Sequence, residues 1–171
     1  MSGTVLVTYA SRYGSTGEVA EAIANTLRNT GLDVELQPMN AVQSLDGYRA
    51  VVLGAPLYIG SWHKDAHNFL ARHEGALAGL PVAIFALGPL GTSEGEMQGS
   101  REQLDKELVQ YPWLQPVTVE MFVGKYDPAR LNLLHRLLTV LPASPLHGMP
   151  ASDHRDWDAI KAWATSLEDQ L

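Results

Sequence analysis

A cluster of hydroxyl residues around one glycine interrupts the apolar pattern near the N-terminus. Ser11, Ser15 and Thr16 surround Gly14 where an apolar run gives way to a helical pattern. Hydroxyl groups, a glycine that admits close backbone approach, and the unpaired N–H groups of a helix start can together hold a phosphate. The Gly-Lys-Ser/Thr pattern of triphosphate loops and the G-x-G-x-x-G spacing of dinucleotide loops are both absent. A single terminal phosphate is the predicted ligand, and the alternative is an ordinary polar strand-to-helix loop.

Arg12 and the histidines His63 and His67 can each be interpreted in two ways. Arg12 lies inside the loop, where it is either a counter-charge for the phosphate or an exposed loop cation. His63 and His67 are four residues apart with Asp65 between them, a spacing that suits metal ligands on one helix face. The sequence offers no convergent third ligand. We therefore expect His63 to cap or to line the loop at residues 54–63.

The composition limits the classes of function. The chain has 171 residues and no cysteine, which excludes thiol redox chemistry, disulfides, iron–sulfur clusters and thiolate zinc sites. Any redox activity therefore requires a bound cofactor. The formal net charge of −7 argues against a nucleic-acid partner, because phosphates would be repelled by the overall field. Residues 1–4 contain no basic residue, so the sequence predicts neither a signal peptide nor a membrane span. It predicts a cytoplasmic location.

Apolar runs alternate with helical patterns along the whole chain, which we expect to form one domain over residues 1–171. Short apolar runs bounded by turn residues predict strands at 4–10, 33–39, 49–55, 81–88 and 117–124. Helical spacing of apolar residues predicts helices around 19–27, 66–70, 104–108, 127–142 and 157–167. Asp127 and Pro128 are the expected N-cap and first residue of the fourth helix.

This alternation predicts an α/β fold, a doubly wound five-stranded parallel sheet with helices on both faces. The second and fifth predicted strands alternate apolar with polar residues, whereas the other three are apolar almost throughout. The alternating strands belong at the edges, which gives the strand order 2-1-3-4-5. In such a sheet, ligands bind beyond the carboxyl ends, where the order reverses between strands one and three. The hydroxyl loop lies at that point.

The loop at residues 8–16 resembles the phosphate-binding loop of flavodoxins, in which hydroxyls and backbone amides hold the phosphate of FMN. Residues 54–63 are similar to the family's loop beside the flavin ring, and residues 88–91 fall where its second ring-side loop lies. The resemblance implies a flavodoxin-like fold and FMN as cofactor. The residues it places around FMN are Ser11, Arg12, Tyr13, Gly14, Ser15, Thr16, Leu57, Tyr58, Ile59, Gly60, Ser61, Trp62, Gly88, Pro89, Leu90 and Gly91.

Three of these residues have a specific expected role beside the ring. Tyr58 and Trp62 are the candidate stacking partners, with the alternative that one of them belongs to the core. Gly60 could change its peptide orientation between redox states at little steric cost, or could be an ordinary turn glycine.

The resemblance is greatest to the branch of menaquinone-dependent protoporphyrinogen dehydrogenases. It shares the segments 48–55 and 60–63 and the Asp156-Trp157 pair. This implies an oxidoreductase that passes electrons from an organic substrate to a quinone or similar acceptor. The flavin carries the chemistry, so no catalytic base is expected. The alternative is a non-catalytic electron carrier whose acidic surface docks with basic redox partners.

One apolar helix pattern, residues 131–141, bears on the partner. It is apolar around much of its circumference, and we expect it to pack across the sheet and against a neighbouring helix. The alternative is an exposed surface for a lipid, a quinone or a protein partner, which would place the chain peripherally at the inner face of the membrane.

Overall fold

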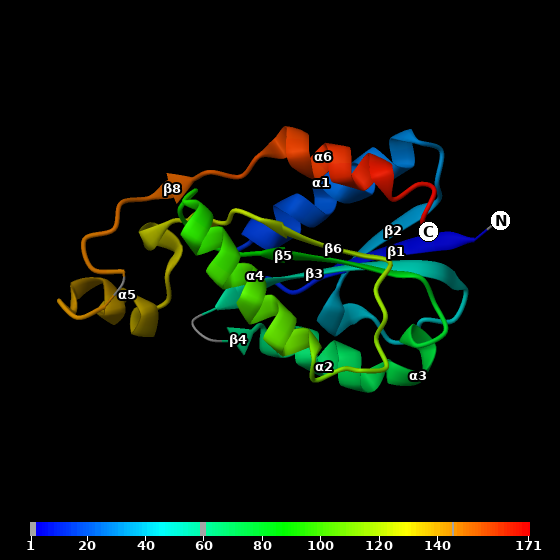
Figure 1. Ribbon diagram of the computed structural model, residues 1–171, viewed down its shortest axis with the longest axis horizontal. Coiled ribbons are helices and arrows are strands. Elements are labelled where there is room, and N and C mark those ends of the chain that lie inside the picture. Colours follow the sequence, from blue (N-terminus) through cyan, green and yellow to red (C-terminus); the bar gives the residue numbers. More distant parts are fainter. Residues whose placement is uncertain (1–2, 59–60, 145) are drawn as a thin grey trace.

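The computed structural model describes residues 3–58, 61–144 and 146–171. Its centre is a parallel sheet with helices on both faces (Figure 1). The order of its strands is β2-β1-β3-β5-β6, which confirms the predicted order. The short strand β4 pairs antiparallel with the end of β3. The bounds are β1 (Thr4–Tyr9), β2 (Val34–Pro38), β3 (Tyr48–Tyr58), β4 (Ser61–Trp62), β5 (Val82–Leu87) and β6 (Thr118–Phe122).

Two helical layers cover the sheet (Figure 1). One face carries α1 (Ser15–Asn29) and the C-terminal helix α6 (Trp157–Ser166). The other carries α2 (Lys64–Arg72), α3 (Glu74–Leu77) and α4 (Glu94–Leu108), with the 3-10 turn η1 (Met39–Ala41). Both faces of the central strands are therefore buried, and all six residues of β5 are inaccessible to solvent. Such burial explains why these strands read as continuous apolar runs.

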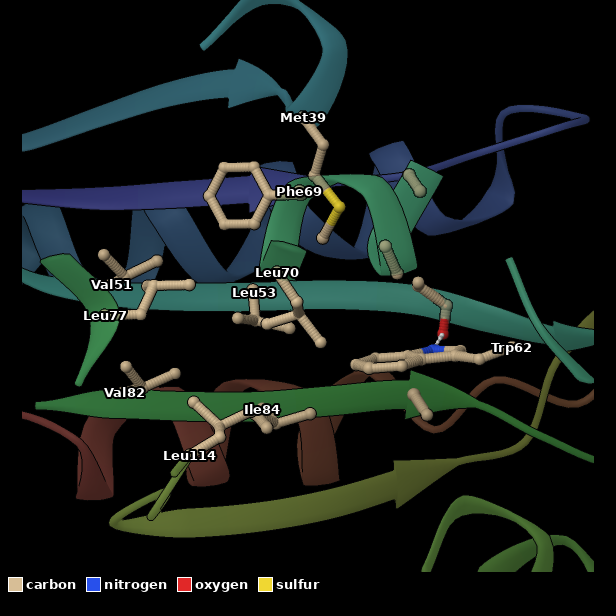
Figure 2. Close-up of a cluster of buried hydrophobic side chains, with 14 of the residues drawn as sticks. Met39, Val51, Leu53, Trp62, Phe69, Leu70, Leu77, Val82, Ile84 and Leu114 are labelled. Carbon is tan, nitrogen blue, oxygen red and sulfur yellow. Dashed lines mark hydrogen bonds between the residues drawn. The ribbon is translucent and has the colours of Figure 1, made fainter. Parts of the chain in front are cut away.

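Figure 2 shows the core on the α2 face of the sheet. Leu53 of β3 and Ile84 of β5 lie side by side in it, and Phe69 and Leu70 of α2 cover them. This packing fixes β3 and β5 against each other, so that the loops that follow them leave the sheet at neighbouring points.

The segment between β6 and α6 departs from the predicted single helix over 127–142. It contains β7 (Lys125–Tyr126), the 3-10 turn η2 (Pro128–Arg130), α5 (Leu133–Val140) and β8 (Ser152–Asp153). Asp127 caps the first turn as expected, accepting a hydrogen bond from Ala129 N at 3.0 Å. The helix then stops, because Leu131 is extended and Asn132 caps a new helix by accepting from His135 N at 2.9 Å. The expectation of one helix is thus wrong.

The position of α5 also differs from the expectation. None of its eight residues, all of which the structure describes, is buried. β7 and β8 form a separate two-stranded sheet, and α5 lies with them beyond the carboxyl ends of the main strands rather than across the sheet (Figure 1). The expected packing of α5 on the sheet is wrong, because no strand lies beneath it. In the parts of the chain that the structure describes, no helix has the length and apolar character to cross a membrane.

The histidine that ends α2 makes stability depend on pH. His73 is buried, and its Nε2 has no hydrogen-bond partner within the described residues. Burial lowers the pKa of His73 below its usual 6.5, and Arg72 lowers it further. The unfolded chain therefore takes up this proton before the folded chain does. Stability is expected to fall as the pH drops below about 6.5.

We expect His73→Leu to reduce this dependence. In urea unfolding at pH 7.5 and pH 5.5, the variant should lose less free energy of unfolding on acidification than the wild type. His154→Leu, at an exposed histidine, is the control and should behave like the wild type. An equal loss in His73→Leu would assign the acid sensitivity to other groups.

Candidate functional site

The loop between β1 and α1 is built to present backbone N–H groups. Gly14 has φ +89° and ψ −16°, a left-handed conformation that glycine adopts at little cost. Its N–H donates to Ser11 Oγ at 2.9 Å, which fixes the turn. Gly14 is also the N-cap of α1, and no side chain caps that helix. The first-turn amides of residues 15–17 therefore have no acceptor within the helix and point toward a common site.

Thr16 adds a hydroxyl to these amides. The residue is buried, and its Oγ1 has no hydrogen-bond partner among the residues that the structure describes. A buried hydroxyl without a partner costs about 1–3 kcal/mol, so such a group is rare unless a ligand satisfies it. The unpartnered oxygen and the uncapped helix start fit a phosphate monoester.

A cavity of about 320 Å³ adjoins this loop. Its volume is in the range of small-ligand sites. It lies at the carboxyl ends of β3 and β5, the position that the fold class predicts for a ligand. The predicted site residues that line it are Tyr13, Ser15, Leu57, Gly88, Pro89 and Leu90.

The remaining predicted residues lie elsewhere or are not described. Arg12 is exposed, and its charge is close enough to His63 and His135 to lower the pKa of both. Gly91 packs against α4, since a Cβ there would lie 2.3 Å from Glu96 Oε2. Ile59 and Gly60 lie outside the described residues.

One of the two ring-side aromatic candidates is a core residue. Trp62 belongs to the core, where its indole N–H donates to the carbonyl oxygen of Ala55 at 3.1 Å (Figure 2). This is the alternative that one of the pair is a core residue. Tyr58 is the last residue of β3, and its backbone pairs with Ser61 of β4. Ser61 is exposed, and its hydroxyl donates to the carbonyl oxygen of Trp62 at 3.2 Å.

The two histidines with metal-like spacing serve the packing of α2. His63 is the N-cap of α2, and its Nδ1 accepts a hydrogen bond from Asp65 N at 3.1 Å. Burial lowers the pKa of His63, so this nitrogen stays an acceptor at neutral pH. His67 Nε2 lies 2.9 Å from Glu107 Oε2, and its Nδ1 is hydrogen-bonded to the hydroxyl of Tyr111. His67 thus joins α2 to α4.

Residues 124–138 and Leu146 form the outer wall of the cavity, and the sequence did not indicate this role. Its lining residues are Gly124, Lys125, Tyr126, Asp127, Arg130, Leu131, His135, Leu138 and Leu146, and α4 adds Ser100 and Gln103. His135 Nδ1 is hydrogen-bonded to the hydroxyl of Tyr13, and the two rings meet edge-on at 6.0 Å. Arg130 Nη1 donates to the carbonyl oxygen of Tyr13 at 3.3 Å. This segment therefore brings a guanidinium and an imidazole to the hydroxyl loop.

The side chain of Arg155 connects the start of α1 to β8, which pairs with β7 in the outer wall of the cavity. This side chain is only 3% exposed and donates from Nε and Nη2 to Asp153 of β8, at 2.8 and 2.7 Å. Nη1 reaches Glu18 Oε2 at 2.6 Å and the carbonyl oxygen of Ser15 at 3.3 Å. The guanidinium also lies 4.6 Å above the ring of Trp157. These contacts fix the uncapped helix start relative to β8, and through β8 to the cavity wall.

Curated relatives match parts of the chain. Protoporphyrinogen IX dehydrogenase [quinone] of Escherichia coli (strain K12) is 25% identical over 84 residues, covering 48% of this chain and 46% of the relative. NAD(P)H dehydrogenase (quinone) 3 of Rhizobium meliloti (strain 1021) is 28% identical over 120 residues, covering 57% and 56%. The chain thus spans about half the length of the curated relatives it matches.

Solved structures match the fold over nearly the whole chain. A flavodoxin from the domain Archaea superposes with a TM-score of 0.60 at 16% identity, covering 97% of this chain and 96% of that one. The rubredoxin oxygen:oxidoreductase of the anaerobe Desulfovibrio gigas gives 0.56 at 18% identity, covering 97% of this chain and 35% of that one. At these identities the likeness establishes the fold.

The Flavodoxin domain family matches residues 6–148. This range contains most of β1, the hydroxyl loop with its unpartnered Thr16, both ring-side loops and the outer wall of the cavity. Because the match spans most of the chain and includes the loop that fits a phosphate, the chain belongs to the flavodoxin domain family, and its cofactor is FMN.

Proposed function

We propose that the protein is an FMN-dependent oxidoreductase that passes electrons from an organic substrate to a quinone or similar acceptor. The cavity beside the hydroxyl loop carries this proposal. Leu57, Leu90 and Leu138 line it from three different segments, and α5 walls it on the side away from the sheet. Such an apolar enclosure suits a flat ring and an apolar reactant. An electron carrier needs only an exposed ring edge.

The curated relatives support a quinone as the redox partner, because both names contain that word. The chain matches only about half of the length of each relative. We therefore propose an organic molecule as the electron donor and do not name a particular one. We place this electron transfer in the cytoplasm, at the inner face of the membrane.

The residues that would hold the cofactor divide into two groups. Thr16 Oγ1, the Ser15 hydroxyl and the first-turn amides of α1 would hold the phosphate through charge-assisted hydrogen bonds of about 1.5–3 kcal/mol each. Leu57 and the loop residues 88–90 would flank the ring. When bound, FMN supplies the transfer of electrons or hydride.

Tyr13 and His135 would place a proton in the cavity wall. Burial lowers the pKa of His135, and the charge of Arg12 lowers it further, so the imidazole is neutral at pH 7. A neutral imidazole can accept a hydrogen bond at Nδ1 from the Tyr13 hydroxyl. The pair would therefore hold one proton in the cavity wall, in the hydrogen bond between Tyr13 Oη and His135 Nδ1.

Steady-state assays of the FMN-loaded protein test this function. With a porphyrinogen or a reduced flavin as donor, we expect menadione to be reduced at a rate that saturates with menadione concentration. Electron transfer from a ferredoxin or flavodoxin reductase is measured in parallel. Transfer from the reductase without any quinone turnover would contradict the proposal.

That contrary result would favour a second candidate, a non-catalytic electron carrier. The observation behind it is the net charge of −7, which would attract basic redox partners. Its rate of reduction by a basic reductase should fall steeply with ionic strength, because exposed charges are screened.

Arg130 gives a further test of the phosphate site. We expect Arg130→Gln to weaken FMN binding about two- to fivefold at low salt, because an exposed cation beside a dianion contributes up to about 1 kcal/mol. Riboflavin, which lacks the phosphate, should bind to the variant and the wild type alike. Titration of the apoprotein, followed by flavin fluorescence, measures both affinities.

Arg101→Gln is the matched control, since Arg101 is 50% exposed and paired with Glu120, as Arg130 is 52% exposed and paired with Asp127. An equal loss of FMN affinity in both variants would place Arg130 outside the phosphate site.

A further inference from the structure

The outer face of α5 carries an apolar stripe that nothing in the described chain covers. Leu133, Leu137 and Val140 are 80%, 54% and 65% exposed. Their i, i+4, i+7 spacing aligns them on one side of the helix. Leu134 and Leu141, both exposed, widen the stripe. Large apolar side chains gathered in this way mark an interaction surface rather than scattered exposure.

The opposite side of the same helix faces inward. His135 and Leu138, three residues apart, line the cavity. α5 therefore already packs one of its faces against the protein, and the exposed stripe is a second, separate face of the helix. Only the width of α5 separates the stripe from the cavity beside the hydroxyl loop. Whatever covers the stripe lies directly against the wall of the site.

The charge around the stripe identifies the kind of surface that fits it. Residues 128–152 contain Arg130 and Arg136 and no carboxylate. The whole chain carries −7, so everything outside this segment carries −9. Arg136 is exposed on α5 itself. An anionic bilayer would repel the acidic remainder of the protein and attract this segment. A second copy of the chain would bring two strongly acidic bodies together.

We propose that the outer face of α5 docks on an anionic lipid bilayer, with the apolar stripe in the interfacial region and Arg136 at the lipid headgroups. The helix then lies in the membrane plane at one end of the molecule, and the sheet stands away from the lipid (Figure 1). The proposal rests on the proposed function in one respect, that a quinone dissolved in the bilayer would reach the cavity past α5.

Sedimentation of the FMN-loaded protein with vesicles tests the docking. The two vesicle types are pure phosphatidylcholine and phosphatidylcholine mixed with phosphatidylglycerol. We expect clear binding to the anionic vesicles and weaker binding to the neutral ones. Leu133→Gln/Leu137→Gln should reduce the partition coefficient at least about tenfold, because two large apolar side chains no longer enter the interface. Arg136→Gln should reduce it about threefold to fivefold on anionic vesicles only.

Val109→Gln is the matched control, because Val109 is 77% exposed at the end of α4, away from α5. It should bind vesicles like the wild type. All of these side chains are exposed, and unchanged thermal unfolding of the variants confirms that each is folded. The mass of the protein by light scattering is measured for each variant.

Three results would overturn the docking proposal. They are wild-type protein that binds neither vesicle, equal binding to both vesicles, and a wild-type dimer that the double substitution dissociates while vesicle binding is absent. Vesicle binding and menadione reduction are separate measurements. Loss of the first with the second intact rejects the docking alone, and the reverse rejects the proposed function alone.

Discussion

Replacing Thr16 with valine is expected to weaken FMN binding about 10- to 100-fold while leaving the FMN-free protein at least as stable as the wild type. The Thr16 hydroxyl is buried and has no partner among the described residues, so the apoprotein carries the cost of its desolvation. A phosphate oxygen would accept its proton in a charge-assisted hydrogen bond. Valine has nearly the same shape and removes both effects.

The two effects have opposite signs, and this makes the test specific. FMN titration measures the lost affinity, and urea unfolding of the apoprotein measures the stability. Thr26→Val is the control in the same helix, because Thr26 Oγ1 donates to the carbonyl oxygen of Ala22 at 2.8 Å and lies far from the loop. It should leave FMN affinity unchanged. If Thr16→Val retained full affinity for FMN, the phosphate would bind elsewhere.

Replacing Arg155 with methionine is expected to lower the free energy of unfolding by about 2–4 kcal/mol. The buried guanidinium makes hydrogen bonds to Asp153, Glu18 and the carbonyl oxygen of Ser15. Breaking a fully buried pair costs about 3–5 kcal/mol, but here the two carboxylates are about 40% exposed and water can solvate them. The start of α1 also loses its tie to β8. FMN affinity should therefore fall more than riboflavin affinity.

A change in pH dependence separates this role from a general loss of packing. The hydrogen bonds from Arg155 hold the pKa of Asp153 below its usual 3.8. Asp153 thus contributes stability that is present above pH 3.8 and is lost as the pH falls through its lowered pKa. Arg155→Met should flatten this acid limb, which urea unfolding between pH 5 and pH 2.5 measures. Arg101→Met, at a half-exposed arginine, should change neither quantity appreciably. An unaltered acid limb in Arg155→Met would contradict the assigned pairing.

Helix ends show where sequence reasoning works and where it is incomplete. Asp127 before Pro128 correctly predicts a cap, because capping depends on residues two or three positions apart. The second cap at Asn132 was missed, although an asparagine directly before an apolar run is a signal of the same kind. The single helix predicted over 127–142 ran through that break, because the apolar pattern of 131–141 gives no sign of it. A helical pattern alone therefore does not locate an interruption at one extended residue.

The residues around the cofactor divide in the same way. The sequence places Ser15 and Thr16 at a phosphate site, since a strand, a glycine and a helix start follow one another along the chain. It gives no sign of Arg130 or His135, which reach Tyr13 across 117 and 122 residues. It also left open which of Tyr58 and Trp62 is a core residue. Only packing decides that question, and the Trp62 side chain lies in the core.

The sheet, its strand order, the hydroxyl loop and the family resemblance could all be predicted from the amino-acid sequence. These depend on local period, on burial of both strand faces and on short motifs, all of which involve neighbours in the chain. The tertiary structure decided the outer wall of the cavity, the buried contacts of Arg155 and the exposure of α5. Each of these depends on which distant segment fills a given space, and no periodicity along the chain encodes that choice.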